Sequence, residues 1–271
     1  MTLPRLWRVL AIALPALAAL IAPLPAVDLA YQLRAGADIL GAGAIPTTDT
    51  WTFTSAGNPW LDQQWGAQVL LAAVYQLGSW TALVLFRAVL VALAFGLLQA
   101  TIRSRAPAAS DRTVALLNIA AFIVAANALA LRPQLIAIDL LAATLWILAV
   151  RDRWPRAVWA IPLLTIAWAN VHGTFPIALG LCGLAWLADL YDARPAHRGS
   201  VHRMLAVGLV STAATVVTPF GPAVWGYVAS LTANPTIAAR VSEWQPPSPL
   251  TVPGALVWLS VIAVAALAIR R

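Results

Sequence analysis

The sequence contains no lysine, one cysteine and few charged side chains of any kind. Charged residues make up 10% of the chain, whereas a soluble domain usually carries about a quarter. This scarcity excludes an ordinary water-soluble enzyme. The lone Cys182 also excludes a disulfide framework or a cysteine-based zinc cluster, because each needs several such side chains.

Apolar residues are abundant instead, at 61% of the 271 residues, which excludes intrinsic disorder. The net charge of +7 is carried by arginines that sit in small groups between long apolar runs. We therefore expect no nucleic-acid partner, since that function is typical of a continuous basic surface. The complete replacement of lysine by arginine is typical of a GC-rich coding bias.

Eight stretches approach the roughly 20 apolar residues that a helix needs to cross a bilayer. Because the hydrocarbon core satisfies no open backbone groups, these stretches should be helices. The sequence thus predicts an all-α, polytopic membrane helix bundle, with residues 1–271 as a single membrane domain and about eight spans. The expected spans are 6–27, 80–102, 114–131, 135–150, 158–171, 177–190, 204–219 and 254–269.

Thirteen of the 17 arginines fall at the termini or in alternate turns, on one side of this topology. The positive-inside rule assigns that side to the cytoplasm, so both termini should be cytoplasmic. We expect a bacterial inner membrane location. The first apolar stretch is preceded by Arg5 and Arg8, as in a signal peptide, but its length favours a retained anchor.

The longest connection, residues 28–79, should lie on the external face. A loop of this length in a compact bundle is usually functional or structured. Helical spacing predicts two helices along the membrane surface, 29–40 and 60–77, on either side of an irregular segment at 41–59 that is rich in turn-forming residues.

The same external level should collect ionisable side chains that are far apart in the sequence. Carboxylates and cations at the rim of a bundle can activate a hydroxyl and hold a phosphate, which suits group transfer from a lipid phosphate. The residues expected there are Asp28, Asp49, Asp62, Arg132, His172 and Glu243.

Each of the three central residues has a catalytic and a structural interpretation. Asp28 is the candidate general base, or else a helix cap. Arg132 could bind the donor phosphate through two guanidinium bonds, or reach toward lipid headgroups. His172 could bind or protonate the leaving phosphate, or serve as a packing residue.

The other candidates have similar pairs of interpretations. Asp49 and Asp62 could be turn residues, or could join Asp28 in holding Mg²⁺ or Mn²⁺. Glu243 and Trp244 could contact an acceptor sugar, or anchor the chain at the interface. Within the spans, Arg87 is expected to pair with Asp139.

With these residues identified, the chain resembles the GT-C superfamily of integral-membrane glycosyltransferases. This superfamily includes protein O-mannosyltransferases, the aminoarabinose transferase of lipid A and oligosaccharyltransferase catalytic subunits. The resemblance covers most of the chain up to about Pro247. It is carried by Asp28, the first-loop stretch RAGADILGAGAIPTTDTWTFTSAGNPWLDQQW, the RPQL that begins at Arg132, WANVHG around His172, and EWQPP from Glu243.

The resemblance implies transfer of a sugar from a polyprenyl-phosphate donor to an acceptor hydroxyl or amine on the outer face, with Asp28 as the essential acid. The chain departs from many relatives because Leu29 follows Asp28 where a second acid is common, and because it has fewer spans and no soluble C-terminal domain. It would be a short form of the conserved membrane module. A transporter, a lipid-handling scaffold and an inactive assembly partner remain alternatives.

Overall fold

The computed structural model describes residues 2–24, 26–191, 198–241 and 244–269. These residues form helices and connecting turns, and the strand-like pairing among them is one isolated bridge between Thr48 and Pro59. The helices are α1 (Leu3–Ile21), α2 (Ala26–Ala42), α3 (Trp65–Arg105), α4 (Asp111–Ala125), η1 (Ala126–Ala128), α5 (Pro133–Val150), η2 (Ala157–Ala160), α6 (Ile161–Ala169), α7 (Pro176–Tyr191), α8 (Arg198–Ala214), α9 (Ala223–Thr232), α10 (Pro235–Arg240) and α11 (Val252–Ile269).

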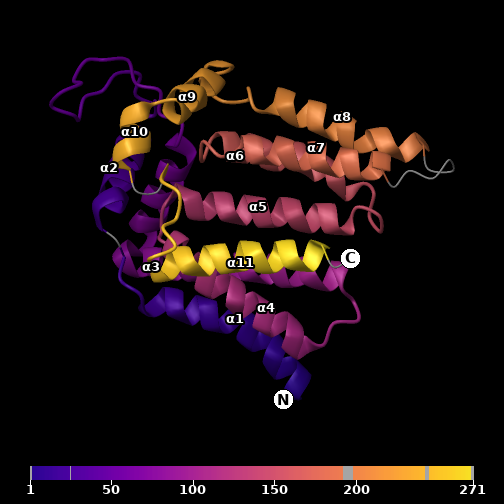
Figure 1. The fold of residues 1–271 in the computed structure, drawn as a ribbon. Coiled ribbons are helices and arrows are strands. Elements are labelled where there is room, and N and C mark those ends of the chain that lie inside the picture. Colours follow the sequence, from indigo (N-terminus) through magenta and orange to yellow (C-terminus); the bar gives the residue numbers. More distant parts are fainter. Residues whose placement is uncertain (1, 25, 192–197, 242–243, 270–271) are drawn as a thin grey trace.

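The long helices lie roughly side by side, whereas α2, α9, α10 and the 43–64 loop gather at one end of the bundle (Figure 1). Helix α3 is central: it packs against α1, α2, α4 and α5. A second group is formed by α6, α7 and α8, with α5 joining it to the first. The architecture is therefore an all-helical bundle with one end covered by short helices and an irregular loop.

Five helical segments within the described residues are long and apolar enough to cross a membrane. They are Leu3–Ile21, Trp65–Arg105, Asp111–Ala128, Pro133–Val150 and Val252–Ile269. Many large apolar side chains on these helices are exposed, as expected for surfaces that face lipid rather than water.

The other three expected spans form helices that are too short to meet this criterion. Helix α6 ends just before Asn170, whose side chain donates a hydrogen bond to a carbonyl in the last turn of the helix. Helix α7 begins only at Pro176, whose ring nitrogen has no hydrogen to donate. Helix α8 ends at Ala214 and is followed by turns up to Gly221. Helix α6 is thus shorter than the expected span at 158–171, whereas α7 covers all of 177–190 and α8 covers 204–214 of the span expected at 204–219.

Helix α3 joins two elements that the sequence separates. The expected surface helix at 60–77 and the expected span at 80–102 are one long element, in which Gly78 and Ser79 leave helical geometry. Ser79 has a φ of 54°, an uncommon conformation for a residue with a side chain. The break lies where the change from loop to span was expected.

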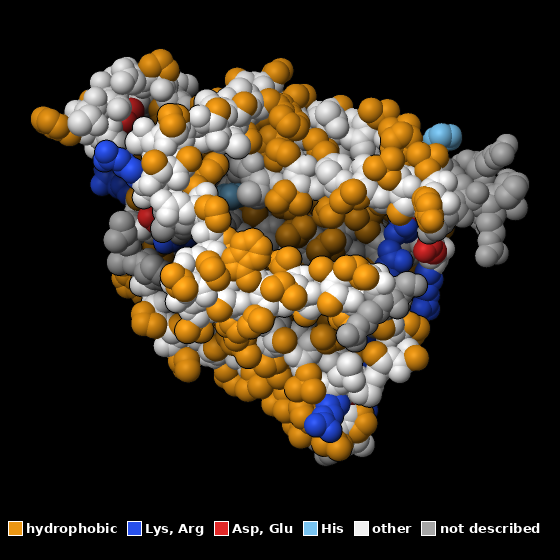
Figure 2. All heavy atoms as spheres, viewed as in Figure 1, with side chains coloured by type: hydrophobic (Ala, Val, Ile, Leu, Met, Phe, Trp, Pro, Cys, Tyr) orange, Lys and Arg blue, Asp and Glu red, His pale blue; other side chains and the backbone are white. Residues whose placement is uncertain are grey.

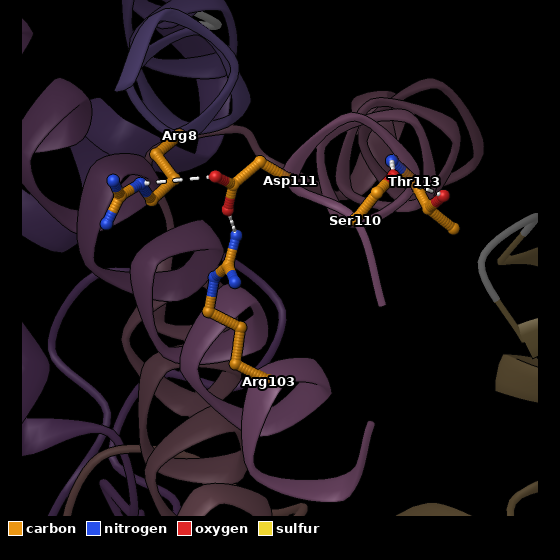
Figure 3. A network of polar contacts seen from close by, with 5 residues as sticks. All are labelled: Arg8, Arg103, Ser110, Asp111 and Thr113. Atoms are coloured by element: carbon orange, nitrogen blue, oxygen red, sulfur yellow. Dashed lines mark hydrogen bonds and ion pairs between the residues drawn. The ribbon is translucent and has the colours of Figure 1, made fainter. Parts of the chain in front are cut away.

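The other end of the bundle gathers charged side chains from several helices. The Asp111 carboxylate, at the start of α4, contacts both Arg8 of α1 and Arg103 of α3 (Figure 3). Ser110 caps the same helix by accepting a hydrogen bond from the Thr113 amide at 3.1 Å. Arg151, after α5, pairs with Asp189 of α7 at 2.6 Å. These are arginines that the sequence assigns to the cytoplasmic side.

Arg87, inside α3, does not form the expected ion pair with Asp139. Its guanidinium is buried and donates to the backbone carbonyls of Ala19, Ala22 and Pro23, where α1 ends. The carbonyls at the end of a helix carry partial negative charge, so they can stabilise the cation without a carboxylate. Both oxygens of Asp139 are buried with no hydrogen-bond partner among the described residues.

Candidate functional site

An ion pair joins the start of α2 to the start of α5. The Arg132 guanidinium lies 3.0 Å from Oδ2 of Asp28, and both side chains are partly exposed. Asp28 lies in the first turn of α2, and Arg132 occupies the N-terminal cap of α5 in an extended conformation before Pro133. Two of the residues that the sequence placed at one level are thus in direct contact.

A cavity of about 470 Å³ borders Arg132 and lies between the start of α5, the η1 region and the N-terminal part of α11. Its polar lining includes Asn127, Gln134 and Gln245, and its apolar lining includes Val124 and Val257. Figure 2 shows this face of the molecule hollowed between α11 and the α6–α7 layer. A cavity with a guanidinium and apolar walls can hold an amphiphile with an anionic head.

Helix α11 borders this cavity loosely. Gly254 is its only buried residue, and it is tightly packed because an added Cβ would lie 1.9 Å from the Ser248 carbonyl oxygen. Trp258 also ties the helix to its preceding loop by donating to the Pro247 carbonyl at 2.8 Å. The rest of α11 exposes its apolar side chains, so the cavity has a wall that can face lipid.

His172 lines a smaller cavity of about 160 Å³. Gln134 borders both cavities, so they adjoin along the first turn of α5. Nδ1 of His172 contacts the Thr174 hydroxyl at 2.9 Å and accepts from the Thr174 amide, which places the ring proton of the neutral form on Nε2. Burial lowers the pKa of His172 to about 4, so the ring is neutral near pH 7.

A third cavity, of about 280 Å³, lies beside Arg87 at the end of α1. It shares Asn127 and Ala130 with the Arg132 cavity. The three cavities therefore follow the 126–134 segment, with Arg87, Arg132 and His172 contributing one each to their walls.

Asp62 is not at an exposed rim but is 3% exposed, immediately before α3. Its Oδ1 accepts from the Gln68 side chain at 2.8 Å, while its Oδ2 has no hydrogen-bond partner among the described residues. Burial raises the pKa of Asp62 to about 6. Burial raises the pKa values of Tyr31 of α2 and Tyr227 of α9, and the nearby Asp62 charge raises both further.

A network of amides around Asp62 joins the first loop to the WANVHG segment. Gln63 donates to the Ala169 carbonyl at 2.8 Å, and Trp65 donates to the Asn170 side chain at 2.9 Å. The Gly66 amide donates to the Asn170 carbonyl at 3.0 Å, an approach that a Cβ would obstruct. The sequence analysis did not single out Asn170 or the glutamines for this role. The sequence feature that could have indicated this role for the glutamines is the run of amide side chains in LDQQWGAQ.

Asp49 has a structural role in the loop. Its carboxylate accepts from the amides of Trp51 and Thr52 and from the Thr52 hydroxyl, and these bonds lower its pKa. Asp28 is paired with Arg132 instead. Among the described residues, no three histidine, cysteine or acidic side chains group as metal ligands, and no contact joins Asp28 and Asp49 in a metal site.

The expected acceptor residues lie at the end of the chain that leads into α11. Glu243 lies outside the described residues. Trp244 is 46% exposed, and its neighbour Gln245 lines the Arg132 cavity while donating to the Ala239 carbonyl. The EWQPP segment thus borders the cavity through Gln245 and Pro247.

In comparisons with protein-family models, curated proteins and solved structures, nothing matches this chain. The resemblance to GT-C glycosyltransferases therefore stays a prediction from the sequence motifs. What the structure adds is an all-helical membrane-type bundle in which Asp28 and Arg132 touch beside a cavity.

Proposed function

We propose that the protein transfers a sugar from a polyprenyl-phosphate donor to an acceptor hydroxyl or amine, as a short GT-C-type glycosyltransferase. The observation that carries this proposal is the Asp28–Arg132 pair beside a cavity of about 470 Å³ with apolar walls. A carboxylate can take a proton and a guanidinium can hold a phosphate, and both are needed at one place for this reaction.

In the proposed reaction, the donor phosphate binds Arg132 and competes with Asp28 for the guanidinium. The Asp28 carboxylate then takes the proton of the acceptor while the acceptor oxygen or nitrogen attacks the anomeric carbon. The bond from that carbon to the phosphate oxygen breaks, and its electron pair leaves with the phosphate. Arg132 stabilises the negative charge that develops there.

His172 would act as a neutral hydrogen-bond donor rather than as a cation. Its ring is neutral near pH 7, so we propose that the Nε2 hydrogen donates a hydrogen bond to the donor phosphate or sugar within the adjoining cavity. The apolar walls near α11 would hold the first isoprene units. Trp244, with Glu243, remains the proposed contact for the acceptor.

We propose that α6, α7 and α8 also cross the bilayer, giving eight spans in a bacterial inner membrane. They lie alongside α5 and the long helices in Figure 1. The arginine-rich end would be cytoplasmic with both termini, and the Asp28 end would be external. Short helices can cross where the local bilayer thins or where their flanks extend into the headgroup region.

The test is transfer by the purified chain in lipid vesicles, with a panel of polyprenyl-phosphate-linked sugars as donors and a cell-envelope extract as acceptor. Asp28→Asn should abolish transfer with donor binding retained. The matched control is Asp38→Asn, which alters a partly exposed acid on the same helix α2 that pairs with Arg34. Unchanged transfer by Asp28→Asn would refute the proposal, as would the failure of every donor in the panel to bind.

A second candidate function is ion transport through the bundle, and Asp139 is the observation that favours it. This carboxylate lies within α5, is 6% exposed and has no hydrogen-bond partner among the described residues. Acidic side chains inside spans often mark ion pathways. A proton or cation flux into vesicles that Asp139→Asn abolishes and Asp28→Asn preserves would favour transport.

A further inference from the structure

A basic pocket lies at the end of the bundle opposite the Asp28–Arg132 pair. It has a volume of about 540 Å³ and is lined by Arg153, Trp154, Pro155, Arg156, Trp159 and Arg203. The first five follow α5 and run into η2, whereas Arg203 comes from α8. Three guanidinium groups from two separate parts of the chain thus surround one hollow.

The positive charge of this pocket is not cancelled by an acid in its lining. The described residues that line it include no aspartate or glutamate. Asp189, an acid on the neighbouring α7, is engaged by Arg151 at 2.6 Å. Asp152 is exposed beside the pocket but does not line it. The pocket therefore keeps a net positive charge and is complementary to an anion.

The aromatic residues indicate where this anion comes from. Trp154 and Trp159 are each about half exposed, and the Arg153 guanidinium lies 5.3 Å from the Trp154 ring centroid. Exposed tryptophans beside arginines are typical of the membrane interface, where the ring contacts acyl chains and the cation contacts headgroups. The Arg105 side chain also reaches the Leu148 carbonyl at the same end of α5, which places the pocket level with the charged end of α3.

We propose that this pocket binds the phosphodiester headgroup of an anionic phospholipid from the membrane in which the protein lies. Arg153, Arg156 and Arg203 contact the phosphate oxygens, and the two tryptophans pack against the glycerol and the upper acyl chains. Basic pockets between helices bind anionic lipid headgroups in this way. The site is separate from the proposed sugar transfer and does not depend on it.

The experiment compares lipid retention by native mass spectrometry after the purified chain is exposed to phosphatidylglycerol or phosphatidylcholine in mixed micelles. We expect the phosphatidylglycerol adduct to dominate for the unaltered protein. Arg156→Gln/Arg203→Gln should weaken that adduct about tenfold or more, since each basic side chain near a lipid surface contributes appreciably to anionic lipid binding.

The matched control is Arg5→Gln/Arg112→Gln, which removes two exposed arginines from the same end of the bundle but outside the pocket. It should retain the phosphatidylglycerol adduct. An equal loss in both double variants, or in neither, overturns the proposal. If circular dichroism shows that the pocket double variant is unfolded, Arg156→Gln is compared with Arg112→Gln, because both of those side chains are exposed.

Inorganic phosphate separates a lipid site from a site for a free anion. It carries the same oxygen chemistry but cannot use the tryptophans. Addition of inorganic phosphate in excess over the lipid should leave the adduct in place. Complete displacement by phosphate would overturn the assignment to a lipid.

Discussion

The guanidinium of Arg132 lies 3.0 Å from the carboxylate of Asp28, although the long helix α3 and helix α4 separate the two residues along the chain. The contact joins the starts of two helices beside a cavity that Arg132 lines. An exposed ion pair contributes only about 0–1 kcal/mol to folding. The ion pair therefore adds little to the stability of the fold, and its position beside the cavity is what indicates a functional role.

The first prediction concerns this pair. Arg132→Gln should weaken binding of a polyprenyl-phosphate donor about 10- to 100-fold, because a charge-assisted hydrogen bond to the phosphate is lost. Asp28→Asn should instead tighten donor binding or leave it unchanged, because the competing carboxylate is gone. Fluorescence titration with a polyprenyl phosphate measures both, and a similar loss of affinity in the two variants would contradict the competition.

The second prediction concerns Asp62 and the stability of the external loop. Burial raises the folded-state pKa of Asp62 from 3.8 to about 6, so the folded protein holds this proton more tightly than the unfolded chain. The contribution of Asp62 to stability should be greatest below about pH 4, fall by up to about 3 kcal/mol as the pH rises to 6, and stay low above it. Asp62→Asn should remove this fall.

Hydrogen exchange of the first loop and the start of α3, measured between pH 4 and 7, reports this effect after correction for the intrinsic exchange rate. Asp38→Asn is the control, because Asp38 lies on α2 and is partly exposed. Because His172 contributes in the opposite direction over this range, the effect of Asp62 is measured as the difference between the unaltered protein and Asp62→Asn. The same pH dependence of loop protection in these two proteins would contradict the buried placement of Asp62.

The third prediction concerns His172, whose contribution to stability changes with pH in the opposite direction from that of Asp62. Burial lowers its folded-state pKa from 6.5 to about 4, so the contribution of His172 to stability is full above pH 6.5 and is lost as the pH falls toward 4. The loss should reach about 3 kcal/mol near pH 4. Nuclear magnetic resonance of labelled histidines should show a ring that is neutral at pH 6, with its proton on Nε2.

His202 provides the comparison for this measurement because it is exposed on α8. His172→Gln should remove the acid-side loss, whereas His202→Gln should not. A His172 ring that titrates together with His202 would contradict the buried placement.

The fourth prediction concerns the contact between α2 and α3. A Cβ on Gly36 would lie 2.0 Å from the Gln68 carbonyl oxygen, whereas a Cβ on Gly41 of the same helix would meet nothing within 4 Å. Gly36→Ala should therefore lower the thermal stability by about 1–3 kcal/mol or separate the helices. Gly41→Ala should be neutral or slightly stabilising, because alanine favours the helix. Equal melting temperatures for the two variants would show that α2 is not packed this closely on α3.

The sequence pattern predicted the presence of most helices but not their exact roles. The apolar runs indicated helices at α1, α3, α4, α5 and α11, and the structure confirms these five as long enough to cross a membrane. The expected spans at 158–171, 177–190 and 204–219 correspond to α6, α7 and α8, which are helices of fewer than 18 residues. Hydropathy reports apolar content, whereas the end of a helix depends on local capping such as that of Asn170.

The polar residues show the same division. The sequence placed Asp28 and Arg132 at one level, and the structure brings them into contact. It paired Arg87 with Asp139, and this was wrong, because the carbonyls at the end of α1 reach the guanidinium instead. It also placed Asp62 at the rim of the bundle with the other candidates, and the structure shows that its side chain is buried.

The sequence by itself determined that this protein is a bundle of apolar helices with its arginines concentrated at particular turns, because apolar content and charge are properties of local stretches. Which carboxylate meets which cation, which polar atoms are buried and where cavities open were decided only by tertiary structure. Those features depend on the close packing of separate helices, such as the packing of α2 against α3 at Gly36. A linear sequence pattern does not show which helices come into contact.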